Sequence, residues 1–177
     1  MTAGSQPDTL VAVDFETAGF TAHSACAVGL ARIEHGHVGE TFYSLIRPPS
    51  PHVRFTHIHG LTWPVLKDAP TFAQVWPHMA AFFAEADAFL AHNASFDRRV
   101  LYACCEAVGV SCPTLPFLCT LKGVRAGLPL PSKKLSCCCA YFTIPLNHHN
   151  ACSDAAACAE LYLRLRGLGI TDAQMQL

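Results

Sequence analysis

The apolar run from Leu10 to Phe15 constrains the fold more than any other segment of the chain. It reads Leu-Val-Ala-Val-Asp-Phe, which is the length of one strand and too short for a typical helix. A run of this kind is typical of a strand covered on both faces, so we expect a layered sheet with this strand near its centre. Asp14 and Glu16 lie two residues apart where the strand ends, and their side chains therefore point to the same face.

Two more strands are predicted directly after the first. Residues 25–33 and 38–46 flank the segment Glu34-His35-Gly36-His37, which is typical of a tight turn between antiparallel strands. Together with the first strand, these segments predict a three-stranded antiparallel meander.

The rest of the chain predicts helices that alternate with strands. Thr71 to Gln74 has the spacing of a capping box, and the helix that it begins is expected to run to about Glu85, bent or restarted near Pro77. We also predict a short buried strand at 88–91, an edge strand at 117–120, and helices at 96–108, 135–142 and 153–165. This order predicts an α/β fold: a ribonuclease H-like mixed five-stranded sheet, with three antiparallel strands first, parallel βα units after them, and helices on both faces.

The length and hydropathy of the chain indicate one domain. Its 177 residues are enough for a single core, expected over about residues 9–166 with short tails at both ends. The composition is 51% apolar, yet no stretch of about 18 uncharged apolar residues occurs, and Met1 to Asp8 lacks a basic start followed by an apolar run. We therefore expect one domain over residues 1–177, no membrane segment and a cytoplasmic location.

The 10 cysteines raise two alternatives, a disulfide framework and a zinc protein. Several of them are sequence neighbours, as in Cys104-Cys105 and Cys137-Cys138-Cys139, and no Cys-x-x-Cys occurs. They lie in apolar stretches, so we interpret them as small core residues in a reducing compartment. A zinc protein that uses the surplus of Cys and His remains an alternative, which metal analysis of the purified chain would test.

The net charge of about −1 excludes a strongly basic surface of the kind that most duplex-binding modules carry. Affinity for a nucleic acid would have to be local, from bound cations and a few basic residues, and the salt dependence of binding should then be modest.

Four carboxylates are candidates for a metal site. Asp14 and Glu16 repel each other, and this arrangement either raises one pKa or requires a cation, most often a hard divalent ion with oxygen ligands. Asp97 and Asp154 each lie near the start of a predicted helix, where an α/β layout brings chain to the same edge of the sheet. Taken singly, these two aspartates have the alternative role of helix caps or dipole partners.

Four motifs in order resemble a known family. The segments Asp14-Phe15-Glu16-Thr17, His92-Asn93-Ala94-x-Phe96-Asp97 and His149-x-Ala151-x-x-Asp154 resemble the three exonuclease motifs of the DnaQ-like (DEDDh) 3′→5′ exonucleases. Ile58-His59-Gly60-Leu61-Thr62 is similar to a segment of bacterial members near the DNA polymerase III epsilon subunit, and the whole chain is similar to the exonuclease X branch. The resemblance covers residues 9–165.

This resemblance implies a site and a cofactor. It implies metal ligands at Asp14, Glu16, Asp97 and Asp154, and His149 as the general base. Two divalent cations, Mg²⁺ or Mn²⁺, are expected: one on Asp14, Glu16 and Asp154, and one on Asp14 and the scissile phosphate with help from Asp97. The expected products are nucleoside 5′-monophosphates. His148, next to the base, is interpreted as a packing residue or a partner of a ligand.

The substrate contacts are hypotheses of lower rank. Thr17, His59, Asn93 and Phe96 are candidates for binding the terminal nucleotides, although Phe96 has the alternative role of a core aromatic. The pairs Lys133-Lys134 and Arg98-Arg99 are candidates for contacts with phosphates, with solvated helix surface as the alternative.

The expected partners are single-stranded 3′ ends, of DNA first. A 3′→5′ exoribonuclease of the same fold, similar to RNase T or oligoribonuclease, is the first alternative, because no residue separates a pocket that accepts a 2′-hydroxyl from one that excludes it. A nucleic-acid-binding module without catalysis is the second. Because the chain ends at Leu177, soon after the last motif, we expect a free-standing monomer or homodimer and see no segment that would tether a polymerase for proofreading.

Overall fold

The structure, a computed structural model, describes residues 9–177, and the tail expected over residues 1–8 lies outside them. The described strands are β1 (Thr9–Thr17), β2 (Ala25–Glu34), β3 (His37–Leu45), β4 (Ala88–Ala91) and β5 (Phe117–Cys119). The described helices are α1 (Thr56–His59), α2 (Trp63–Leu66), α3 (Phe72–Phe82), α4 (Ala94–Val108), α5 (Thr120–Gly127), α6 (Leu135–Phe142), α7 (Ala151–Gly167) and α8 (Asp172–Met175).

The strands form one mixed sheet in the order β3-β2-β1-β4-β5, with β1 at its centre. The meander β1-β2-β3 is antiparallel, whereas β4 runs parallel to β1 and β5 parallel to β4. The turn between β2 and β3 uses two residues with positive φ, His35 and Gly36. The predicted fold class is therefore confirmed, with the doubly covered strand where it was expected.

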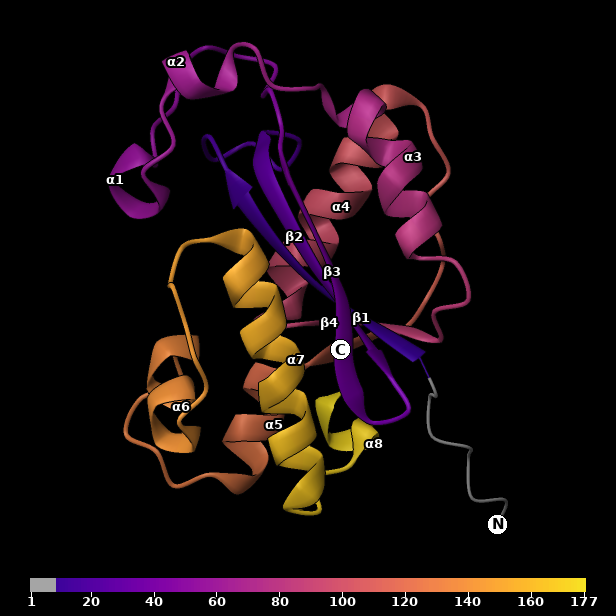
Figure 1. Cartoon of the computed structure of the whole chain (residues 1–177), viewed down its shortest axis with the longest axis vertical. Helices are drawn as coiled ribbons and strands as arrows, with labels where there is room; N and C mark the ends of the chain where they lie inside the picture. The colour runs from indigo at the N-terminus through magenta and orange to yellow at the C-terminus, as the bar shows by residue number, and fades with distance from the viewer. Residues whose placement is uncertain (1–8) are drawn as a thin grey trace.

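Helices cover both faces of the sheet, as Figure 1 shows, and β1 contributes alternate side chains to the two cores. The odd-numbered side chains from Val11 to Phe15 pack with α3 and α4, and Leu10 and Ala12 pack with α5, α6, α7 and α8. Because the period of a strand is two, Asp14 and Glu16 continue the second series and face α7 at the end of β1.

The predicted helices are present, with shifted ends. α3 begins after Thr71 with the predicted capping box, in which Thr71 and Gln74 bond each other's backbone, and it ends at Phe82 rather than near Glu85. α4 and α7 each begin two residues before the predicted start, and α6 has the predicted bounds.

Four short helices, α1, α2, α5 and α8, were not predicted. α5 shows why, because two of its eight residues, Gly123 and Gly127, disfavour a helix. A Cβ at Gly123 would lie 2.8 Å from the Met175 side chain, so close packing against α8 selects glycine there. The predicted edge strand ends at Cys119, and Thr120 begins α5. β5 does lie at the edge of the sheet, with one antiparallel bridge from Leu118 to Gln176 on its outer side.

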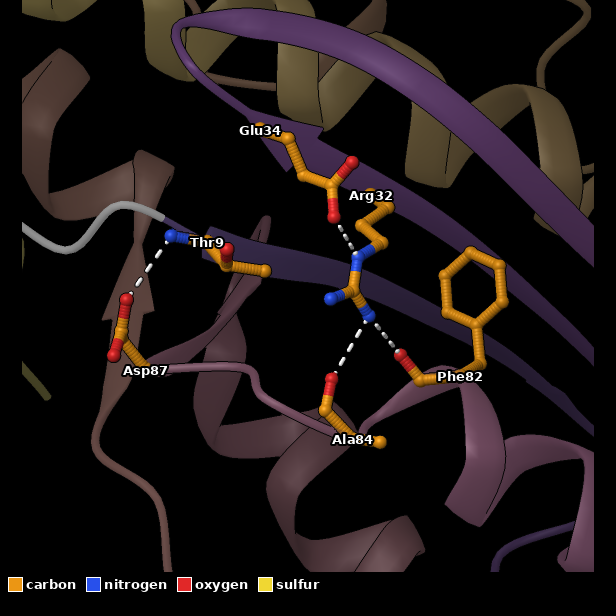
Figure 2. Close-up of polar contacts among 6 residues, drawn as sticks. All are labelled: Thr9, Arg32, Glu34, Phe82, Ala84 and Asp87. Atoms are coloured by element: carbon orange, nitrogen blue, oxygen red, sulfur yellow. Dashed lines mark hydrogen bonds and ion pairs between the residues drawn. The ribbon is translucent and has the colours of Figure 1, made fainter.

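Polar contacts fix the end of the sheet opposite to Asp14 and Glu16 (Figure 2). Arg32 of β2 pairs with Glu34 at 2.6 Å and donates through one terminal nitrogen to the carbonyls of Phe82 and Ala84, at 2.9 and 3.0 Å. The backbone N–H of Thr9 donates to the Asp87 carboxylate at 3.0 Å. These bonds hold the end of α3 and the start of β4 against the sheet.

Seven of the 10 cysteines are buried in the apolar cores, which agrees with their interpretation as small core residues: Cys26, Cys104, Cys105, Cys119, Cys138, Cys139 and Cys158. Among residues 9–177, no helix combines the length and the apolar character needed to cross a membrane.

Candidate active site

Three of the predicted metal ligands meet at the end of β1. Asp14 and Glu16 project from β1 toward α7, and Asp154 lies in the first turn of α7. One carboxylate oxygen from each of the three lies within 4.8 Å of the other two. Oxygens at this spacing from residues 14, 16 and 154 form one cluster, so the predicted convergence of these side chains is present in the structure.

Close packing of α7 on β2 brings Asp154 to this point. Gly29 is the β2 partner of Asp14, and a Cβ at Gly29 would lie 2.0 Å from the Ala151 carbonyl oxygen. Only glycine therefore lets the first turn of α7 rest on the strand. Asn150 caps this turn, because its side-chain oxygen accepts from the Ser153 N–H at 3.1 Å.

Asp97, the fourth predicted ligand, is not one of this group of three and is positioned by the other layer of helices. It lies in the first turn of α4, is only 2% exposed, and accepts a hydrogen bond of 3.0 Å from the backbone N–H of Phe15. Asn93 turns the chain from β4 into α4 with a φ of 73°, in the left-handed region that Asn tolerates better than most residues. The Phe15 N–H therefore holds Asp97 next to the strand that carries Asp14.

The cluster carries more negative charge than its surroundings tolerate. Burial raises the pKa of Asp14, and the charges of Asp97, Asp154 and Glu16 raise it further. Burial, followed by the charge of Asp154, raises the pKa of Glu16 to about 7. Burial also raises the pKa of Asp97, although its hydrogen bond from Phe15 opposes this. A bound cation would remove the conflict, which is the physical reason to treat the cluster as a metal site.

The predicted base, His149, lies at the rim of this cluster in an exposed loop. Its φ of 68° is unusual for a residue with a side chain, and its backbone N–H donates to Asp154 at 2.9 Å. Loss of water around the ring and the neighbouring His148 lower the pKa of His149. The ring is therefore neutral at pH 7, the state that a general base needs.

His148 contacts both the predicted base and a predicted metal ligand. Its ring stacks on that of His149, with centroids 3.9 Å apart and an interplanar angle of 24°. Its Nδ1 lies 3.2 Å from Oδ1 of Asp154. Both roles considered from the sequence, packing and contact with a ligand, are therefore present in the geometry.

These residues surround an open cavity of about 270 Å³, lined by Asp14, Phe15, Glu16, His92, Lys134, Leu135, His148, His149 and Asp154. Sequence reasoning did not assign a site role to His92 or Leu135. His92 Nε2 donates to the Lys133 carbonyl at 2.9 Å, so Nδ1 accepts from the Thr120 hydroxyl, also at 2.9 Å. His92 therefore ties the end of β4 to the segment before α6, and its place in the second motif was the signal for it.

The four candidate substrate residues do not line this cavity. Thr17 is buried, and its carbonyl accepts from Nε2 of His59 at 3.3 Å, while Nδ1 of His59 accepts from the Leu61 N–H at 3.1 Å. Asn93 forms the turn before α4. Phe96 packs half-buried against the core on the α3 and α4 side. Their roles in binding stay predictions, and His59 has both ring nitrogens engaged within the protein.

Of the four basic side chains considered for phosphate contacts, one lies at this cavity. Lys134 lines the cavity. Lys133 instead donates through Nζ to two carbonyls in the loop before α6, those of Leu128 and Leu130. Arg98 and Arg99 lie on the outer face of α4, where Arg98 is over the Tyr102 ring and lines a separate surface hollow.

An exposed aromatic residue beside β1 was missed. Phe20, three residues after the end of β1, is 79% exposed and contacts Phe55 edge-on, with centroids 5.0 Å apart. Hydrogen bonds of Ser24 to Gly19 and Thr21 fix the loop that carries it. A lone Phe in a loop gives no sequence signal of exposure, so only the structure identifies this ring as free for stacking.

Known proteins with the same sequence pattern are exonucleases and polymerases. The model of the exonuclease family named RNase T matches residues 11–162. A PolC-type DNA polymerase III of Thermotoga petrophila is 29% identical over 171 residues, and that of Oceanobacillus iheyensis is 31% identical over 163 residues. These alignments cover 92% and 89% of this chain but only 12% and 11% of the two polymerases.

Solved structures with the same fold are nucleases. Exonuclease X, in complex with 5′ overhanging duplex DNA, superposes with a TM-score of 0.76 at 25% identity, covering 94% of this chain and 96% of that one. The nuclease domain of 3′hExo, a DEDDh family member bound to rAMP, superposes with a TM-score of 0.78 at 18% identity, covering 95% and 96%.

Proposed function

The chain belongs to the exonuclease family described by the RNase T model and is DnaQ-like, and from this we propose that it removes nucleotides one at a time from the 3′ end of single-stranded DNA. One observation carries the proposal: the carboxylates of Asp14, Glu16 and Asp154 converge within 4.8 Å beside His149, at the end of the central strand. We further propose that the core over residues 9–166 works as one exonuclease domain.

The ligand set fits hard divalent cations. All three converging groups are carboxylates, and oxygen ligands are those that Mg²⁺ and Mn²⁺ prefer. Asp14, Glu16 and Asp154 would hold one ion, and Asp97, whose charge acts on Asp14, would help to hold a second. Two bound cations supply a hydroxide nucleophile and neutralise the charge that develops on the phosphate and the leaving oxygen.

The chain's own residues then have separate tasks. His149 accepts a proton from the attacking water, since its lowered pKa leaves the ring neutral. Asp154 accepts a hydrogen bond from the backbone N–H of His149, which ties the loop that carries the base to the first turn of α7. Lys134 lines the wall of the cavity, which supports the proposal that it contacts the phosphate.

We assign the stacking of the terminal bases to Phe20 as well as to the residues considered from the sequence. Phe20 is exposed, contacts Phe55 at its base and lies close in sequence to Glu16. Stacking of a base on an aromatic side chain is largely independent of which base it is. The Thr17 backbone is proposed to meet the 3′-hydroxyl. Asn93, at the turn before Asp97, and Phe96 are kept as further candidates for binding the terminal nucleotides.

The relatives favour DNA over RNA as the substrate. Those at 29–31% identity are DNA polymerases, and the solved neighbour at 25% identity was captured with DNA. We propose that the products are nucleoside 5′-monophosphates, which leave the 3′-hydroxyl on the shortened strand.

The test is digestion of end-labelled oligonucleotides by the purified chain. Single-stranded DNA and RNA of one sequence are each labelled at the 5′ or the 3′ end and incubated with Mg²⁺, with Mn²⁺ or with chelator. We expect a 5′-labelled DNA to shorten stepwise, a 3′-labelled DNA to release its label first as a mononucleotide, and chelator to stop both. The matched control is Asp14→Asn.

Three outcomes would contradict parts of the proposal. Internal cuts would contradict exonuclease action, and faster digestion of RNA would favour the ribonuclease alternative. Equal activity of wild type and Asp14→Asn would trace the cleavage to a contaminant and overturn the proposed site.

A further inference from the structure

We propose that His148, His149 and Asp154 form a second metal site, which binds a borderline transition metal ion such as Zn²⁺. An ion bound there prevents Mg²⁺ from binding to the carboxylate cluster of Asp14, Glu16 and Asp154. A ligand atom from each of the three residues of the second site lies within 4.8 Å of the other two. The site itself stands independently of catalysis, and only its inhibitory consequence rests on the proposed function.

The donor set separates this site from the carboxylate cluster. Two imidazoles and one carboxylate suit Zn²⁺, Ni²⁺ or Co²⁺, whereas Mg²⁺ prefers oxygen ligands alone. For one pair of ligand atoms, the spacing is already close to that around a bound ion. Two ligands of a tetrahedral zinc ion with bonds of about 2.0–2.1 Å lie about 3.3 Å apart. Nδ1 of His148 and Oδ1 of Asp154 are 3.2 Å apart, so a cation can replace the shared proton with little movement.

Charge and exposure favour entry of a cation. The His148 side chain is 39% exposed, while that of Asp154 is 5% exposed, so an ion arriving from solvent meets the imidazole first. A carboxylate oxygen of Asp14 and one of Glu16 lie within 4.8 Å of one of Asp154, and these two groups add negative charge behind the site when they are ionised. Lys134 is the basic side chain among the residues that line this cavity, and it opposes this field only in part.

Binding has one structural requirement. The rings of His148 and His149 are nearly parallel at a centroid distance of 3.9 Å, whereas two imidazoles point at one ion from different directions. One ring must therefore rotate out of the stack. The bond from the His149 N–H to Oδ2 of Asp154 does not involve Oδ1 and can persist, so the loop need not unfold.

The consequence is mutual exclusion. Asp154 belongs to both ligand sets, so one ion displaces the other. A zinc-bound His149 has given its lone pair to the metal and can no longer accept a proton. Zn²⁺ is therefore expected to inhibit Mg²⁺-supported hydrolysis in competition with Mg²⁺, with His148 as the residue that sets the zinc affinity.

The experiment is a calorimetric titration of the whole chain with Zn²⁺ alone, comparing wild type with His148→Phe, His148→Asn and the control His52→Phe. Phenylalanine keeps a flat ring against His149 but lacks the nitrogen, and asparagine keeps a polar group near Asp154 without an imidazole. We expect both His148 variants to bind Zn²⁺ at least about tenfold more weakly, since even outer partners of a ligand are worth that much, and the exposed His52 variant to match wild type.

Co²⁺ then serves as a spectroscopic probe for the ligand type, because thiolates are also zinc ligands and the chain has 10 cysteines. The expected visible spectrum lacks a thiolate-to-cobalt charge-transfer band, and excess Mg²⁺ weakens Zn²⁺ binding in the wild type. Equal zinc affinity of wild type and His148→Phe, or a thiolate band, would overturn the site. If zinc binds as expected but Mg²⁺ supports no hydrolysis of any oligonucleotide, the site stands and the proposed function fails.

Discussion

At the residue scale, the carboxylates are positioned in two different ways. Asp97 and Asp154 each accept a backbone N–H, from Phe15 and His149, so their orientation is set by the fold itself. Asp14 and Glu16 are positioned by the two-residue period of β1, which directs both toward α7. Two fixed acceptors and a strand-borne pair together make a site that is arranged before a cation binds, which lowers the cost of binding.

Replacement of the base is the first prediction. His149→Ala should lower kcat by roughly 10²–10⁴, because proton transfer from water loses its acceptor while the carboxylates stay in place. Calorimetric Mn²⁺ binding measured alongside kcat should change little, since the Asp154 contact comes from the backbone N–H of residue 149. The control is His52→Ala in an exposed loop. A parallel loss of Mn²⁺ affinity and kcat would contradict a role limited to proton transfer.

His59 gives the second prediction, which separates stacking from positioning. His59→Phe keeps a ring for stacking but removes both hydrogen bonds, to the Thr17 carbonyl and from the Leu61 N–H. If the nitrogens matter, His59→Phe and His59→Ala should both lose about 1–3 kcal/mol of stability in urea unfolding, because the Leu61 N–H is left without its acceptor.

The same pair of variants tests the alternative role. Under the stacking hypothesis, His59→Phe would retain the wild-type KM for single-stranded DNA and only His59→Ala would raise it. A stable, fully active His59→Phe would therefore reject the positioning role.

Much of the site was readable from single residues. The spacing of Asp14 and Glu16 along a strand sets their common direction, and the motifs located Asp97, His149 and Asp154. The sequence does not show which hydrogen-bond donor pairs with which acceptor. The tautomer of His59 depends on the Leu61 N–H, and the exposure of Phe20 depends on how its loop leaves β1.

At the element scale, one contact decides where α7 begins relative to the sheet. Gly29, in the middle of β2, has no side chain because the Ala151 carbonyl occupies that space. His149 and Asp154 of the third motif flank Ala151, so the contact between Gly29 and Ala151 also sets where these two residues lie. The positions of the proposed base and of one proposed ligand therefore depend on a glycine that belongs to none of the motifs.

The third prediction concerns this contact. Gly29→Ala places a Cβ 2.0 Å from the Ala151 oxygen, so the start of α7 must move away from β2. We expect a loss of about 1–3 kcal/mol or more in urea unfolding, and a fall in kcat that exceeds any loss from unfolded protein, because Asp154 moves with the helix.

The matched control is Gly167→Ala in the last turn of the same helix, where a Cβ meets nothing within 4 Å. That change should be neutral or stabilise by up to about 1 kcal/mol. Wild-type stability and activity in Gly29→Ala would show that α7 does not need the close approach.

Elements with a strong sequence pattern were predicted, and those held by tertiary contacts were not. β1, which is apolar on both faces, and the capping box at Thr71 can be recognised from the local sequence alone. α5 does not, because Gly123 is present to fit Met175 rather than to favour a helix. Short helices such as α1 and α2 have too few residues for a periodic pattern to emerge.

At the scale of the whole molecule, negative charge is concentrated at one site although the net charge is small. The net charge is about −1, yet three carboxylates converge at the end of the central strand, β1. The opposite end of the sheet is tied by Arg32 and Asp87 (Figure 2), so strain at the carboxylate end is not easily relieved by movement of β1. The folded state without a cation should therefore be destabilised by its own site, and this is measurable as a pH dependence.

The fourth prediction is that stability without metal falls as pH rises. Burial raises the pKa of Glu16 from 4.5 to about 7, so between these values the folded chain binds more protons than the unfolded chain. The stabilisation is then fully present below pH 4.5 and is lost as pH rises through about 7. Each unit of pKa shift corresponds to about 1.4 kcal/mol, so Tm in chelator should be lower at pH 8 than at pH 5.5 by an amount that calorimetry resolves.

Divalent cations should reverse this trend, because they bind the deprotonated carboxylates of the folded state. The gain in Tm on adding Mg²⁺ is expected to grow from pH 5.5 to pH 8. The control is Glu16→Gln, which keeps the shape of the side chain but cannot ionise. It should flatten the fall in chelator and reduce the response to Mg²⁺. Since the histidines titrate in both proteins, their contribution cancels in the difference between wild type and variant. Parallel pH profiles for the two proteins would mean that Glu16 is not held in a strained carboxylate cluster, and the case for a cation at this edge of the sheet would then lose its energetic basis.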